Sequence, residues 1–206
     1  KGGLGRWGSE VHVMLRALGE RRAGLDFGQV PGDDALVRMA RDVLVAAERD
    51  PADAPDLAAH VAAIVRSEFW GRAMKAPRRL FEVPFAVRVE PGDAGYDELV
   101  PGAVAAAGGR AVVAAPGAPV FLSGAVDLLF EEKDGWIIAD YKTDRLPAAL
   151  AGAGAADREA ALAGLVALHA PQVRLYARFW RSLTGEPVKE TGLYFTAFDR
   201  WVALPD

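Results

Sequence analysis

Cysteine is absent from this chain of 206 residues. Its absence excludes disulfide bonds, zinc–thiolate sites and a four-cysteine iron–sulfur cluster. The sequence also lacks an apolar run of membrane-spanning length, a signal-peptide pattern and a Gly-x-x-x-x-Gly-Lys phosphate-binding loop. We therefore expect no membrane partner, and any ATP-driven step must belong to a different polypeptide segment.

The sequence also lacks an excess of positive charge. It has 24 Lys and Arg residues against 28 Asp and Glu residues, which gives a net charge of −4. A free-standing nucleic-acid binder is usually basic, since its affinity comes largely from neutralising phosphates. Basic residues still gather at 66–79 and 174–181, where each group is either a solvated face or a contact surface for nucleic acid. The hydrophobic content of 51% is enough for one sizeable core.

Residues 124–143 carry the most informative pattern in the sequence. Two apolar runs flank Asp134-Gly135, a pair typical of a tight turn, so the segment is predicted to form a β-hairpin. If these two residues make the loop, Lys133 pairs with Trp136. A three-residue loop would instead move one strand's side chains to the other face.

The predicted register brings two carboxylates and an amine together on the hairpin. Asp127 lies opposite Lys142, and Asp140 shares their face because side chains alternate along a strand. The flanking positions are almost all apolar, as in strands buried on both faces, where unpaired charges are costly. An ordinary cross-strand pair on a solvated hairpin is the alternative. Two carboxylates can share Mg²⁺ and a lysine can orient water, so the patch favours metal-assisted phosphodiester hydrolysis.

Three flanking segments extend this pattern. Residues 8–12 open a helix in which His12 lies at the edge of an apolar stripe, and residues 81–85 begin a strand with the pattern Glu-x-Pro-Phe. Gln172 and Tyr176 share one face of a helix predicted to start at Pro171. Taken singly, each segment has an ordinary structural explanation.

In this order, the helical histidine, Glu-x-Pro-Phe, Gly-x-x-Asp, Asp-Tyr-Lys-Thr and Gln-x-x-x-Tyr resemble the RecB-type branch of the PD-(D/E)XK nuclease superfamily. The resemblance covers about residues 5–198. Within that branch, the sequence is most similar to the domain that ends AddA-type helicase-nuclease subunits. The lack of cysteine agrees with this branch, because AddB-type nucleases carry an iron–sulfur cluster around the same core.

The resemblance also implies roles for individual residues. Lys142 would be the catalytic lysine, Gln172 and Tyr176 would line the site near the DNA backbone, and Glu82 occupies a family position whose role we leave open. The implied ligands of Mg²⁺ or Mn²⁺ are His12, Asp127, Asp140 and the backbone carbonyl of Tyr141.

The function implied by the resemblance is metal-dependent, exonuclease-type DNA hydrolysis in double-strand break repair and recombination in the bacterial cytoplasm. A helicase portion of the same polypeptide would deliver single-stranded DNA, and an AddB-like subunit would be a further partner. The first residue, Lys1, is not Met, so we expect a domain excised from a longer chain.

Two alternatives to this function stay open. One is a nuclease-like domain that has lost activity and serves as a DNA-guiding or scaffolding module. The other is an unrelated α/β protein in which the hairpin charges form a structural network, and then His12 would lie far from Asp127.

The expected fold is α/β, with a central mixed β-sheet flanked by α-helices and extra helices at the N-terminus. We predict a single domain over 1–206, in which a mainly helical part (1–75) precedes the α/β core (76–206). A long excursion (91–118) and an Ala/Gly linker (147–156) interrupt the core. The predicted helices are 7–22, 33–49, 54–73, 157–168 and 171–184, and the predicted strands beside the hairpin are 80–90, 191–198 and an edge at 201–203.

Overall fold

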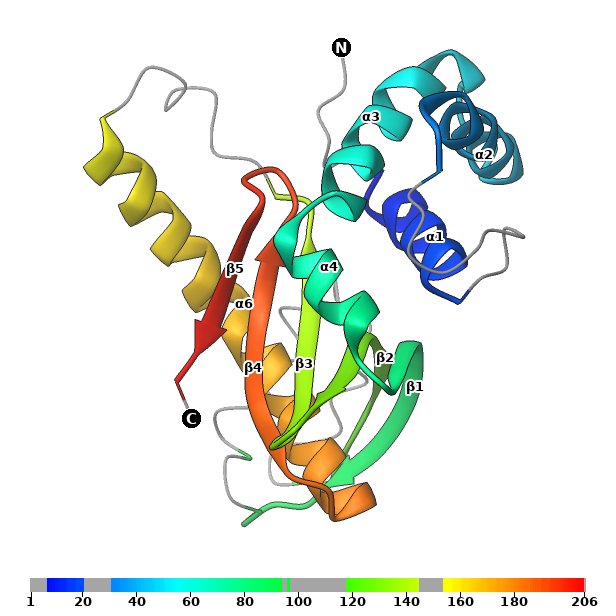
Figure 1. Cartoon of the computed structure of the whole chain (residues 1–206). Helices are drawn as coiled ribbons and strands as arrows, with labels where there is room; N and C mark the ends of the chain where they lie inside the picture. The colour runs from blue at the N-terminus through cyan, green and yellow to red at the C-terminus, as the bar shows by residue number, and fades with distance from the viewer. Residues whose placement is uncertain (1–6, 21–30, 94–95, 97–117, 145–153, 206) are drawn as a thin grey trace.

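The computed structural model describes residues 7–20, 31–93, 96, 118–144 and 154–205 (Figure 1). Within these ranges one mixed sheet has the strand order β1-β2-β3-β4-β5, in which β3 and β4 are parallel and the other neighbours are antiparallel. The predicted excursion and linker lie mostly outside the described residues. The strands are β1 (Arg79–Val89), β2 (Val120–Glu132), β3 (Gly135–Lys142), β4 (Val188–Phe195) and β5 (Arg200–Leu204).

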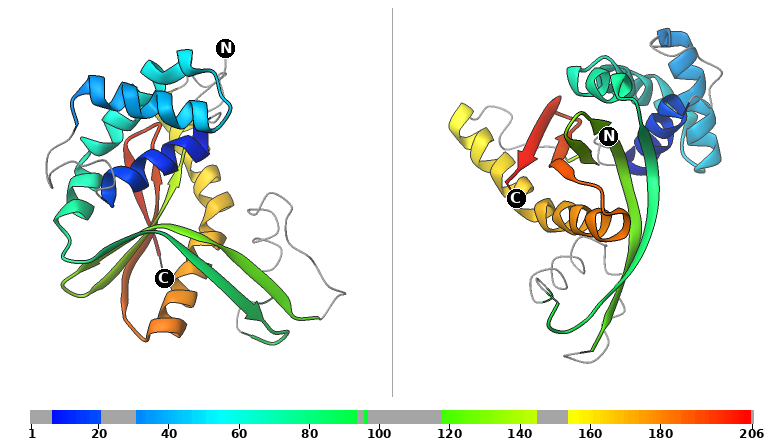
Figure 2. Two further views of the ribbon diagram at one scale, coloured as in Figure 1. Left: turned by 90° about the vertical axis from the view of Figure 1, so that its right-hand side faces the viewer. Right: turned by 60° about the horizontal axis from the view of Figure 1, so that its bottom comes forward.

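Helices cover both faces of the sheet, which confirms the predicted fold class. Figure 2 shows α1 to α4 gathered on one side and α6 on the other. Each side has its own buried core, so the central strands are apolar on both faces. The helices are α1 (Gly8–Gly19), α2 (Asp33–Ala46), the 3-10 turn η2 (Pro51–Asp53), α3 (Ala54–Val65), α4 (Glu68–Lys75) and α6 (Ala155–Thr184).

The central hairpin forms as predicted, but its register differs by two residues. Glu132 pairs with Gly135, so Lys133 and Asp134 make the loop. Gly135 has φ of 136°, and a Cβ there would lie 2.6 Å from the carbonyl oxygen of Pro187. Glycine is therefore needed for close approach at the start of β3, and it does not belong to the loop itself.

This shift changes the partner of Asp127 but does not by itself move any side chain to the other face of the hairpin. Leu128 pairs with Ala139, and the same register places Asp127 level with Asp140 instead of Lys142. An even shift leaves each side chain on its original face. The two acids are therefore neighbours across the hairpin.

The helix predicted over 54–73 is in fact two helices, α3 and α4. Ser67 separates them, because its side chain accepts a hydrogen bond from the backbone N–H of Trp70 at 3.1 Å and caps α4. The apolar pattern runs across this break, which explains why the sequence favoured a single helix.

Conversely, α6 is one helix where the sequence predicted two. It continues through Pro171, although proline lacks a backbone donor and usually ends or kinks a helix. Leu162 before this position and Val173 after it are both buried against the same face of the sheet, so packing holds both halves in place. No helix in the described ranges is both long and apolar enough to span a bilayer.

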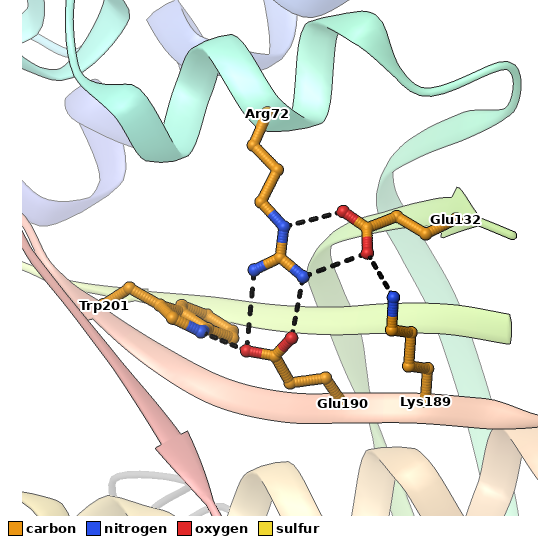
Figure 3. Close-up of polar contacts among 5 residues, drawn as sticks. All are labelled: Arg72, Glu132, Lys189, Glu190 and Trp201. Carbon is orange, nitrogen blue, oxygen red and sulfur yellow. Dashed lines mark hydrogen bonds and ion pairs between the residues drawn. The ribbon is translucent and has the colours of Figure 1, made fainter. Parts of the chain in front are cut away.

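Arg72 links the helical layer to the sheet (Figure 3). Arg72 lies on α4. Its Nε atom donates to Glu132 on β2 at 2.7 Å, and its Nη2 atom donates to Glu190 on β4 at 2.7 Å. Lys189 also donates to Glu132, and the indole of Trp201 on β5 donates to Glu190. The hydrogen bond from Arg72 is the main cause that lowers the pKa of Glu132 to about 2.

We predict that Arg72→Gln lowers the free energy of unfolding by about 1–2 kcal/mol at neutral pH, because two half-buried carboxylates lose a charged donor. The pKa of Glu132 is depressed in the folded protein. Its contribution is therefore present above its ordinary pKa of 4.5 and is lost as the pH falls toward 2. Urea unfolding at neutral pH and at about pH 3 measures both effects.

Arg78→Gln is the matched control, because Arg78 pairs with Glu131 at an exposed position. Its loss of stability should be the smaller one. Equal losses for the two variants, or an Arg72→Gln loss that stays constant at low pH, would contradict the prediction.

Candidate active site

The predicted site residues meet where α1 packs beside β1 and β2. The Nδ1 atom of His12 lies 3.3 Å from Oδ1 of Asp127 and 3.4 Å from Oε1 of Glu82. The ligand atoms of these three residues all lie within 4.8 Å of one another. If the chain were an unrelated α/β protein whose hairpin charges form a structural network, His12 would lie far from Asp127. The structure contradicts this alternative.

The helix α1 presents His12 from the edge of its buried stripe. Val11 and Met14 are fully buried in the core of the helical layer, whereas the side chain of His12 keeps 26% of its surface exposed. Its ring meets the ring of Tyr141 edge to face, with centroids 5.7 Å apart. The helix therefore anchors itself with apolar residues and leaves the imidazole at the sheet.

Glu82 owes its orientation to an irregularity in β1. Its φ is 49°, in the left-handed region that costs a non-glycine residue about 1 kcal/mol or more. The ladder pairs Phe81 with Leu128 and Val83 with Val126, so Glu82 and Asp127 are level with each other between these pairs.

Both strands change the face that they bury at this point. Phe81 and Leu128 pack in the core of the helical layer, but Val126, two residues before Leu128, packs in the core under α6. Regular strands would keep residues two apart on one face. The irregularity brings Glu82 to α1, and no signal in the sequence indicated it.

Asp127 and Asp140 are among the most buried charged groups of the described residues, with exposures of 6% and 2%. While one oxygen of Asp127 lies beside His12, the other accepts the backbone N–H of Tyr141 at 2.7 Å. The carboxylate of Asp127 therefore accepts the β3 hydrogen bond that a backbone carbonyl of β2 would accept in a regular ladder. The regular strand pairing ends just before it, at Leu128 and Ala139.

A second group adjoins the first and carries the lysine. The Nζ atom of Lys142 lies 2.6 Å from Oδ2 of Asp140 and donates to Oε1 of Gln172 at 3.1 Å. The side-chain amide of Gln172 then donates to the hydroxyl of Tyr176, one turn further along α6. The predicted side chains thus converge in two adjoining groups, one around His12 and one around Lys142.

Electrostatics in the site reflect the concentration of carboxylates. Burial, followed by repulsion from Asp127, raises the pKa of Asp140, and Lys142 opposes this shift. Burial lowers the pKa of His12, but Asp127 and then Glu82 outweigh it and raise that pKa to about 10. His12 and Lys142 therefore serve as counter-ions to the acids, and a cation that binds the imidazole would displace the proton of His12.

The donor set of the first group fits a divalent cation. Carboxylate oxygens suit Mg²⁺ and Mn²⁺, and an imidazole suits Mn²⁺ better than Mg²⁺. A cation here would also offset the repulsion that raises the pKa of Asp140. Glu82 belongs to this group of three, whereas Asp140 lies with Lys142.

Sequence reasoning missed His169. Its Nε2 atom lies 3.2 Å from Oδ2 of Asp144, two residues after Lys142. Burial, followed by the charge of Lys142, lowers the pKa of this histidine. It precedes Gln172 by three residues in α6, and that spacing could have indicated a shared helix face.

The basic group at 66–79 is largely engaged in ion pairs. Arg66 binds Asp33 at 2.6 Å, and Arg78 binds Glu131 at 2.5 Å, while Arg72 occupies the network described above. These contacts favour the explanation of a solvated structural face for this group over a surface that binds nucleic acid.

Fold and site together define a class of protein, and sequence comparison agrees. The chain belongs to the PD-(D/E)XK nuclease superfamily, whose family model matches residues 3–200. This finding confirms the resemblance drawn from the motifs.

The chain is also similar to bacterial proteins whose names describe one subunit of an ATP-dependent helicase/nuclease. It is 30% identical to that of Heliobacterium modesticaldum over 197 residues, which is 96% of this chain and 12% of the relative. It is 31% identical to that of Geobacillus kaustophilus over 188 residues, 91% of this chain and 13% of the relative. The chain therefore spans only a small part of the length of these relatives.

Proposed function

We propose that this chain is a Mg²⁺- or Mn²⁺-dependent deoxyribonuclease that hydrolyses phosphodiester bonds in exonuclease fashion. The observation that carries the proposal is the convergence of His12, Glu82 and Asp127 beside the pair of Asp140 and Lys142. Membership of a nuclease superfamily supports it. The scaffold alternative is less favoured, because the chain keeps both the acids and the lysine that the chemistry needs.

The metal-binding part of the site would consist of His12, Glu82 and Asp127. Asp140 and the backbone carbonyl of Tyr141 are further ligands that the family resemblance implies. When bound, the cation would supply Lewis-acid chemistry that offsets negative charge developing at the scissile phosphate.

The second group would act on the attacking water. Lys142 would hold this water in line with the phosphorus atom, since Asp140 and Gln172 fix the position of its amine. Tyr176 restrains Gln172 in turn. Because Asp127 and Asp140 are buried, bulk water screens these interactions little.

We further infer that the domain works in double-strand break repair and recombination as part of an ATP-dependent helicase-nuclease in the bacterial cytoplasm, with an AddB-like partner subunit. The names of the relatives support a helicase attached to a nuclease. The net charge of −4 fits a domain that receives single-stranded DNA from a motor and binds it weakly alone.

We predict that the chain binds Mn²⁺ in isothermal titration calorimetry, and that Glu82→Gln and Asp127→Asn each weaken binding by at least about tenfold. Each variant removes a negative ligand and keeps the shape of the side chain. Glu20→Gln is the control, because Glu20 lies at the end of the helix that carries His12 and pairs with Arg16 instead. Absence of binding by the unaltered chain would favour the scaffold alternative.

Lys142→Ala and Asp140→Ala should each lower the rate of single-stranded DNA cleavage by at least about a hundredfold, with the fold preserved in circular dichroism. Lys133→Ala is the matched control, since this lysine lies in the loop of the same hairpin. Cleavage by Lys142→Ala at the unaltered rate would remove the lysine from the mechanism.

The imidazole ligand leads to a prediction about metal preference. Mn²⁺ should support cleavage at least as well as Mg²⁺ at equal concentrations, because imidazole binds Mn²⁺ more readily. Initial rates on one labelled strand with each ion measure this preference. Activity with Mg²⁺ alone would reject His12 as a ligand.

A further inference from the structure

His60 is a buried histidine that contacts the sheet far from its own position in the sequence. It lies on α3 with an exposure of 8%, and its Nε2 atom is 3.0 Å from the hydroxyl oxygen of Thr196. Thr196 has an exposure of 5% and directly follows β4. Neither residue belongs to the motifs that the sequence revealed.

Thr196 binds the backbone of Lys142 through two groups. Its N–H donates to the carbonyl oxygen of Lys142 at 2.9 Å, and its hydroxyl donates to the same oxygen at 3.2 Å. Lys142 and Phe195 form the last pair of the parallel ladder between β3 and β4. Thr196 therefore closes this ladder at the residue that carries the amine.

The direction of the hydrogen bonds follows from the number of hydrogens. A threonine hydroxyl has one hydrogen and can accept through its lone pairs. If this hydrogen is donated to the carbonyl of Lys142, the hydroxyl oxygen accepts from Nε2 of His60. This direction requires the hydrogen of His60 on Nε2, and the resulting chain of hydrogen bonds, the relay, runs from α3 through Thr196 to β3.

We propose that His60 and Thr196 are positioning residues that fix the backbone of Lys142 for catalysis, an inference that rests on the hydrolysis proposed above. The amine of lysine sits on a flexible stem of four carbons, so its location depends on where the backbone is held. Asp140 and Gln172 restrain the amine itself, and the relay restrains the other end of the residue. The helical layer thus supports the lysine as well as supplying His12.

Thr196→Val tests the relay, because it removes the hydroxyl and nearly preserves the shape. We expect kcat for DNA cleavage with Mn²⁺ to fall about tenfold, with KM changed by less than about twofold, since the loss lies in positioning and not in substrate binding. Thr196→Ser retains the hydroxyl and should restore most of kcat.

Thr191→Val is the matched control, because Thr191 is buried in β4, the strand that Thr196 follows, but pairs with Ile138, away from the lysine. It should leave kcat within about twofold of the unaltered value. Unaltered kcat in Thr196→Val, or an equal fall in Thr191→Val, would overturn the proposal.

His60→Gln and His60→Met form a second pair of variants. The amide nitrogen of glutamine can take the place of Nε2 and donate to Thr196, whereas methionine fills the space without a donor. We expect His60→Gln to keep most of kcat and His60→Met to lose about as much as Thr196→Val. Equal losses in both variants would show a packing role and would contradict the relay.

Nuclear magnetic resonance separates this inference from the proposed function, because it needs neither metal nor DNA. The nitrogen resonances of His60 should show the hydrogen on Nε2, and Thr196→Val should shift the carbonyl carbon resonance of Lys142. If the chain cleaves no DNA, the proposed function fails and these resonances still decide the relay. A hydrogen on Nδ1 alone, or an unshifted Lys142 carbonyl, would overturn it.

Discussion

The repulsion between buried carboxylates is the constraint on which this structure depends. Asp127 and Asp140 lie level on adjacent strands with almost no exposure to water, and Glu82 is level with Asp127 on the strand beyond. Such a cluster is stable only if positive charge reaches it. His12 comes from the helical layer and Lys142 from the sheet itself. The docking of α1 is therefore an electrostatic requirement of the site as well as a matter of packing.

The two-sided sheet explains how distant segments reach one point. The layer of α1 to α4 covers one side of the sheet and α6 covers the other (Figure 1). The first layer supplies His12, and α6 supplies Gln172 and Tyr176, which reach Lys142. The strands change their buried face at Glu82 and Asp127, so their carboxylates leave the regular alternation at the place where α1 arrives. The strained backbone of Glu82 is kept at a cost, as is common at functional sites.

The helical layer is also joined to the sheet by polar contacts on both sides of the site. The network of Arg72 fixes α4 against β2, β4 and β5, and the contact of His60 with Thr196 fixes α3 against the ends of β3 and β4. Polar groups buried at such a junction are costly unless their partners are in place, so they favour one arrangement of the layers. A nuclease site built across two layers needs that uniqueness, because small displacements reduce catalysis strongly.

The sequence by itself determined the fold class, the central hairpin and the membership of a nuclease superfamily. Alternation along the hairpin placed Asp127, Asp140 and Lys142 on one face, and helical spacing placed Gln172 and Tyr176 on another, because these periods are local properties of the chain. Only the tertiary structure decided the hairpin register, in which Gly135 closely approaches Pro187, and the passage of α6 through Pro171. It also decided the turn of Glu82 toward His12 and the meeting of His60 with Thr196. These features depend on contacts between segments far apart in the chain, which leave no periodic signal in a single sequence.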